Sequence, residues 1–197
     1  TGPVRSKPGV GYLKKYIEIG KLTHFAKLFN DFTIDVTTSE VEYKNQEPWI
    51  QWVTVHTGKS YREHGIFRLG DITTNPVVQI WEHLESKGVS VGAVSPMNAA
   101  NRLRAPKYFV PDPWTQTKAS GGWLLQKLHA AVSQAVSDNA TSKITPGSAL
   151  YILLGAAYYA SPSNYMRYLK LATGSRRKKW NKALFLDLLL ADIFMNL

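Results

Sequence analysis

A carboxylate and two amides stand directly before a proline in the stretch Asn45-Gln46-Glu47-Pro48. Proline is well tolerated in the first turn of a helix, and a carboxylate there interacts favourably with the positive end of the helix dipole. The free N–H groups at such a helix start attract phosphate or another anion. A carboxylate beside a bound anion would need a cation nearby. We therefore take Asn45, Gln46 and Glu47 as candidate site residues; the alternative is that Glu47 only caps the helix.

The helix that would position these residues is expected over residues 48–57. Thr57-Gly58 closes it, since glycine readily adopts the left-handed conformation that ends a helix. Trp49 and Trp52 recur at helical spacing, and we expect both to lie in the core and anchor the helix.

The segments around this helix predict an α/β unit. A helix is expected over residues 75–88, with Asn75 as its N-cap and Pro76 in its first turn. The apolar run at 89–94 is typical of a buried parallel strand, and the alternating residues 32–38 indicate another strand. We expect part of a three-layer α/β domain with a mostly parallel sheet over residues 1–115.

The second part of the chain, residues 116–197, has helical spacing throughout and predicts four helices, packed as a cap or insertion beside the sheet. It carries 10 Lys+Arg against 3 Asp+Glu, whereas residues 1–115 carry 14 against 11. This basic half raises an alternative function, a non-enzymatic helical module that binds anionic partners. It has no base-reading motif, so sequence-specific nucleic-acid binding is not expected.

The composition limits the other classes of protein. A hydrophobic share of 44% with 19% charged residues in 197 residues predicts a packed core rather than disorder. The sequence contains no cysteine, which excludes disulfides, thiolate catalysis and zinc–thiolate sites. It also has no apolar run of the length of a membrane span, so no transmembrane segment is expected.

Two ordered motifs resemble the alkaline-phosphatase-like superfamily, in particular its type I phosphodiesterase and nucleotide pyrophosphatase branch. Thr57-Gly58 is followed by His64-Gly65-Ile66, as in that family. Downstream, "IWEHLESKGVSVGAV" is similar to the family's "WxxLxxxGxxxG" helix, which leads into a core strand. The resemblance covers about residues 10–115.

The resemblance implies hydrolysis of phosphate monoesters or diesters, or of sulfate esters, at a site with two divalent metals, usually zinc, with manganese or magnesium also possible. The family's nucleophile is a Thr or Ser two residues before the helix's proline. Gln46 stands there in this chain, and an amide cannot be a covalent nucleophile. Glu47 is the residue that could replace it at the centre of the site, as a metal ligand or a base.

The family's other metal ligands have no counterpart among these 197 residues. We expect them outside this chain, because the sequence ends at Leu197 within an apolar helical pattern and suggests a piece of a longer reading frame. On this interpretation the full-length protein is the hydrolase and this chain alone is inactive. A family member that kept the fold and lost the nucleophile is a further alternative. The substrate, the metal, the oligomeric state and the compartment stay open.

Overall fold

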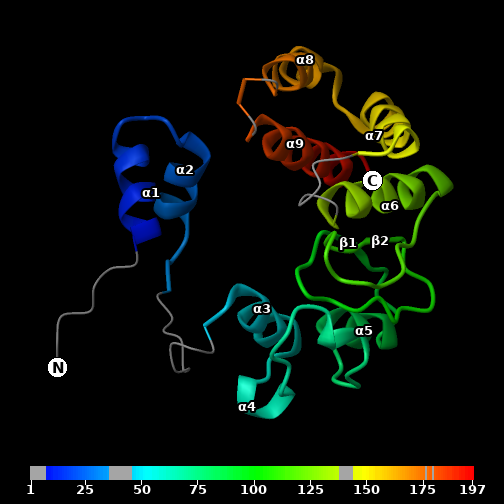
Figure 1. Cartoon of the computed structure of the whole chain (residues 1–197). Helices are drawn as coiled ribbons and strands as arrows, with labels where there is room; N and C mark the ends of the chain where they lie inside the picture. Colours follow the sequence, from blue (N-terminus) through cyan, green and yellow to red (C-terminus); the bar gives the residue numbers. More distant parts are fainter. Residues whose placement is uncertain (1–7, 36–45, 138–143, 176, 179) are drawn as a thin grey trace. The chain divides into compact units, whose positions relative to one another are not determined.

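The computed structural model describes residues 8–35, 46–137, 144–175, 177–178 and 180–197 (Figure 1). The chain divides into two compact units, residues 1–39 and 40–197. The first unit contains a helical pair, α1 (Pro8–Glu18) and α2 (Thr23–Asp31). The strand expected over 32–38 is wrong for residues 32–35, which belong to no strand; residues 36–38 lie outside the described residues.

The second unit begins with short helices, continues with one pair of strands and is entirely helical after them. Its elements, in chain order, are α3 (Pro48–Thr57), α4 (Tyr61–His64), the 3-10 turn η2 (Asp71–Thr73), α5 (Ile80–Ser86), β1 (Gly92–Val94), β2 (Tyr108–Val110), α6 (Trp123–Ser137), α7 (Pro146–Tyr159), the 3-10 turn η4 (Pro162–Asn164), α8 (Tyr165–Gly174) and α9 (Asn181–Asn196).

β1 and β2 form a two-stranded parallel sheet in which Ala93 pairs with Phe109. Parallel strands need a crossover of about a dozen residues or more, and here residues 95–107 provide it. The crossover contains no helix. The predicted strand at 89–94 is therefore confirmed for its last three residues, and its partner is the strand that follows in the chain. The expectation that it is buried is wrong, because Gly92 is exposed and Ala93 and Val94 are half-buried on a sheet of only two strands.

The two faces of this strand pair carry different hydrophobic clusters. Phe109 packs with Trp81 of α5 on one face, in a cluster that Ala93 also contacts. Val110 packs on the other face with residues of α6–α9, in a cluster that Val94 joins. Neighbouring residues of a strand point to opposite faces, so one short sheet supports both groups of helices. A third cluster lies between α3 and the loops that follow it.

The expected helix 48–57 is confirmed with these limits, since Pro48 begins α3 and Gly58 ends it at φ +66°. The expected helix 75–88 is wrong at its start, because α5 begins at Ile80. Asn75 accepts the N–H of Val77 instead and forms a local turn, which competes with helix formation. Trp52 is also not a core residue, since 45% of its surface is exposed.

The described residues after 116 contain four α-helices, as predicted, and no strand beyond a single bridge from Ser120 to Phe109. The molecule is thus a mixed structure with a small parallel sheet and many helices. The division at 115/116 stays a prediction.

None of the helices in the described ranges has both the length and the apolar character needed to cross a bilayer.

The contact of α6 with α7 generates a stability prediction. A Cβ on Gly155 of α7 would lie 2.6 Å from a methyl carbon of Leu128 on α6, whereas a Cβ on Gly147 meets nothing within 4 Å. Gly155→Ala and Gly147→Ala both gain helix propensity, but only Gly155→Ala overpacks the core. We expect Gly155→Ala to be about 1–3 kcal/mol less stable than Gly147→Ala in urea unfolding. Equal stability of the two variants would contradict the close packing.

Candidate functional site

The start of α3 has the backbone geometry of a helix that can receive an anion. Glu47 is the N-cap in an extended conformation, and its carbonyl accepts the N–H groups of Ile50 and Gln51 at 3.0 and 3.1 Å. Its side chain is exposed and makes no capping hydrogen bond. Gln46 is exposed beside it, and Asn45 lies outside the described residues. The structure therefore leaves the Glu47 carboxylate accessible at the positive end of the helix.

Asn98 ties this helix start to the strand pair. Its Nδ2 donates to the carbonyl of Trp49 at 3.0 Å and more weakly to that of Arg68 at 3.4 Å. Its Oδ1 accepts the N–H of Gly70 at 2.8 Å. The side chain is fully buried, so each of these bonds satisfies a group that water cannot reach. The indole of Trp49 adds a second tie, because its N–H donates to the carbonyl of Phe67 at 3.0 Å.

Asp112 completes the link from the end of β2. One of its carboxylate oxygens accepts the backbone N–H of Asn98 at 2.9 Å and the hydroxyl of Thr115 at 2.6 Å. The other accepts the N–H groups of Trp114 and Thr115, both at 2.9 Å. Asp112 stands between Pro111 and Pro113 and shapes a turn there. It is also a buried acceptor whose oxygens are fully used by the chain.

The bonds of Asn98 to Trp49, Gly70 and Asp112 form a joint between α3 and the strand pair. This joint lies just beyond the carboxyl ends of both parallel strands. Ser95 follows β1 with a φ of +54°, and Asn98 has a φ of +50°; these are the two described non-glycine residues with positive φ. Such conformations cost energy and persist only where the surroundings hold them. In open α/β sheets, ligands bind outside the carboxyl ends of the strands. The structure brings the start of α3 to this edge, which is where an anion site is expected.

Thr54 and His64 form a pair that resembles a nucleophile and its base, but the hydrogen bonds exclude that role. Thr54 Oγ1 lies 3.2 Å from His64 Nε2, and the N–H of Ile66 donates to His64 Nδ1 at 3.0 Å. A neutral ring whose Nδ1 accepts must carry its proton on Nε2, and so it donates to Thr54. The protonated Nε2 therefore has no lone pair with which to remove a proton from the Thr54 hydroxyl. His64 thus has a structural role, holding α3 and the loop before Ile66 together.

His56 is likewise a structural histidine. Its Nε2 lies 3.0 Å from the carbonyl oxygen of Met97, so the ring is bonded to the backbone of the crossover. The ring stacks on Trp52 at 5.6 Å and packs against Trp81 at 4.6 Å between centroids. Burial lowers the pKa of His56, and the bond to Met97 only partly offsets this. Trp52 therefore covers a buried imidazole from the solvent side.

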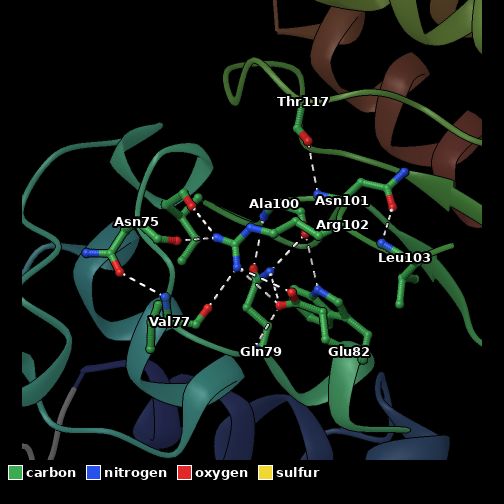
Figure 2. A network of polar contacts seen from close by, with 11 residues as sticks. Asn75, Val77, Gln79, Glu82, Ala100, Asn101, Arg102, Leu103 and Thr117 are labelled. Carbon is green, nitrogen blue, oxygen red and sulfur yellow. Dashed lines mark hydrogen bonds and ion pairs between the residues drawn. The ribbon is translucent and has the colours of Figure 1, made fainter. Parts of the chain in front are cut away.

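Figure 2 shows a neighbouring network built around Arg102, a side chain of the type that binds phosphate. The guanidinium of Arg102 donates to the carbonyls of Ile72, Asn75 and Val77 and contacts the Glu82 carboxylate at 3.3 Å. Glu82 also accepts the backbone and side-chain N–H groups of Gln79. Because these partners occupy the guanidinium, Arg102 stabilises the fold and is not available to a ligand.

Metal ligands do not gather in the described part of the chain: no group of three or more His, Asp or Glu side chains there could hold an ion. Glu47 therefore has no companion ligands among the described residues. Comparison of the chain with protein-family models, with curated proteins and with solved structures found no match.

Sequence reasoning missed Asn98, the residue that assembles this region. The available signal was its position in "SPMNA", a polar residue soon after an apolar strand. Polar side chains at the carboxyl end of a strand often belong to a site. Nothing local indicated that its partners would be Trp49, Gly70 and Asp112.

A pair of substitutions at Asn98 tests this joint. Asn98→Ala and Asn98→Gly both remove three side-chain hydrogen bonds and leave partly buried backbone groups without these partners, so each should lose about 2–4 kcal/mol of unfolding free energy. Asn98→Gly should recover about 1 kcal/mol relative to Asn98→Ala, because glycine tolerates positive φ. Chemical denaturation measures both. Wild-type stability of Asn98→Gly would show that the hydrogen bonds do not hold the joint.

The buried histidines predict a pH dependence of stability. Burial lowers the pKa of His64, with a smaller opposing effect from Glu63. The unfolded chain then binds the proton more readily, so this stabilisation is complete above about pH 6.5 and is lost as pH falls through 6.5 towards the lower pKa of the folded state. His64→Asn should reduce the pH slope, because asparagine does not titrate. Its Oδ1 can replace Nδ1 as acceptor for Ile66 and keep the fold. His83→Asn, at an exposed position, is the control. An unchanged slope in His64→Asn would refute the assignment.

Proposed function

We propose that this chain is part of a metal-dependent phosphoesterase of the alkaline-phosphatase-like type, acting on phosphate monoesters or diesters. The observation that carries the proposal is the joint at Asn98, which brings the start of α3 beside the carboxyl ends of β1 and β2. Helices packed on both faces of the strand pair support the three-layer arrangement that such a domain would have.

The start of α3 supplies the anion-binding part of the proposed site. The helix has ten residues, so its dipole can stabilise the phosphoryl oxygens of a substrate. Pro48 has no N–H and the N–H groups of Ile50 and Gln51 donate to the Glu47 carbonyl, so the dipole carries this contribution. Trp49 and Asn98 hold the first turn in place from two sides. This rigidity matters because a displacement of about 1 Å can cost roughly a hundredfold in rate.

Glu47 supplies the carboxylate of the proposed metal site. Its exposed side chain is free of capping bonds and adjoins the anion position, where two zinc ions, or manganese or magnesium, would balance the charge of substrate and carboxylate. Carboxylate oxygens suit all three ions. We propose that the remaining ligands lie outside this chain and that the chain alone is inactive.

Gln46 favours a second candidate, a family member that binds phosphate esters without cleaving them. Gln46 occupies the position at which the family has its Thr or Ser nucleophile. The hydroxyl of Thr54 does not replace it, because His64 donates to that oxygen. Binding of inorganic phosphate at α3 without turnover of any ester would favour this second candidate.

Glu47→Gln tests the main proposal. In the full-length protein, assayed with a chromogenic phosphodiester and added zinc or manganese, this change should abolish turnover and weaken metal binding. The melting temperature should stay nearly unchanged, because the side chain makes no capping bond. Glu63→Gln is the matched control: Glu63 bonds Ser60 at the start of α4, so its loss should lower stability and leave metal binding intact. If Glu47→Gln keeps full activity, or only destabilises the fold, Glu47 is a helix cap.

A further inference from the structure

A long stretch of the helical half carries positive charge without any compensating carboxylate. Residues 139–186 contain eight Lys and Arg and no Asp or Glu. Helix α8 and the turn that leads to α9 lie within this stretch. Arg167, Lys170, Lys178 and Lys182 are exposed there, and none of them forms an ion pair with a carboxylate of the described residues.

Helix α8 is fixed on its inner side by one buried residue. The hydroxyl of Tyr168 donates to the buried carboxylate of Asp192 at 2.9 Å, and its ring packs on Phe185 of α9 at 5.0 Å between centroids. Asp192 also accepts the N–H of Ser161 and the amide of Asn164. The buried hydrogen bonds around Asp192 therefore fix the rotation of α8 about its own axis. This determines which of its residues face away from α9.

The outer side of α8 is both apolar and basic. At helical spacing Met166 and Lys170 lie opposite Tyr168, with Leu169 next to them. Met166 is 64% exposed and Leu169 is 56% exposed. Tyr165 at the start of the helix is also half exposed. Other helices also expose apolar side chains. What distinguishes α8 is that its exposed apolar side chains stand beside cations without carboxylate partners.

An exposed tryptophan continues this character beyond the helix. Trp180 is 57% exposed, and the ammonium group of Lys178 lies 5.3 Å from the centre of its ring. Tryptophan and tyrosine favour the boundary between lipid headgroups and acyl chains, where one side of the ring is apolar and the other is hydrated. Lysine near such a ring can keep its charge among the headgroups.

We propose that α8 and the turn after it dock on the surface of an anionic lipid bilayer. Met166, Leu169 and Trp180 would enter the boundary of the acyl chains, and Lys170 and Lys178 would contact the anionic headgroups. A nucleic acid would use the same cations but would leave Met166 and Leu169 in water. A bilayer matches both features of the surface. The inference goes beyond the phosphoesterase proposal and does not use α3 or Glu47.

Vesicle flotation with the full chain tests the proposal. The chain should float with vesicles of phosphatidylcholine plus phosphatidylglycerol and not with phosphatidylcholine alone, and added salt should reduce the bound fraction. The tryptophan fluorescence should shift to the blue on binding, and Trp180→Phe should reduce that shift. Equal binding to both kinds of vesicle would overturn the electrostatic part of the proposal.

Two independent variants separate the charged from the apolar contribution. Lys170→Glu with Lys178→Glu should weaken binding at least about tenfold, since each cation near an anionic surface contributes roughly fivefold. Met166→Ser with Leu169→Ser should weaken it at least about threefold by removing the inserted methyl groups. Both replace exposed side chains, and circular dichroism reports whether the fold is kept.

The matched control removes two exposed lysines elsewhere, as Lys59→Glu with Lys87→Glu. This variant has the same net charge as the first and should keep binding within about twofold of wild type. An equal loss in the control would show that net charge alone drives the binding. Full binding by the Met166 and Leu169 variant, or displacement of the vesicles by single-stranded RNA, would indicate a nucleic-acid surface and overturn the proposal. Loss of phosphoesterase activity would affect none of these outcomes.

Discussion

Buried backbone in the non-helical crossover between β1 and β2 is the constraint on which the second unit depends. Asn98, Ala99 and Ala100 are almost completely inaccessible to solvent. Without a helix, their N–H and C=O groups have no regular partners, and an unpaired buried group costs free energy comparable to a lost hydrogen bond. Side chains provide those partners. Asp112 accepts the N–H of Asn98, and Gln79 both accepts from and donates to Ala100.

The same requirement explains why distant segments converge on the crossover. Trp81 also donates to the carbonyl of Ala100, and Thr117 accepts the N–H of Asn101. Each such bond pairs a backbone N–H or C=O group of the crossover. At the same time it fixes the position of the segment that supplies the partner. The start of α3 is held in this way through Asn98. The position of the α3 start at the carboxyl edge of the strands is therefore a consequence of pairing the crossover's polar groups.

The two proposed binding surfaces would attract anions through different kinds of structure. At α3 the proposed attraction comes from backbone dipoles at one point, held rigidly by Asn98 and Trp49. At α8 it comes from long, exposed side chains spread along a helix and a turn. A backbone site suits a small, oriented anion, whereas flexible ammonium groups suit a broad and fluid surface. The two proposals therefore concern ligands of different dimensions and do not compete.

The local sequence determined those helices whose start and end depend only on residues within one or two helical turns. Pro48 and Gly58 bounded α3 correctly, since both act through their own backbone conformation. The helices after residue 116 followed from apolar periodicity, which is also a local property. The mixed α/β character was predictable for the same reason, from one apolar run beside helical patterns.

Only the tertiary structure decided where residues with several possible partners would bond. Asn75 was expected to cap a helix, but it bonds Val77 and the carbonyl of His64, 11 residues away. Trp52 was expected in the core, but it lies over His56 at the surface. Asn98 reaches Trp49 across 49 residues of chain. Side-chain hydrogen bonds are short and directional, so their partners are determined by which buried groups the packed fold leaves unpaired, and this is not encoded in any local pattern.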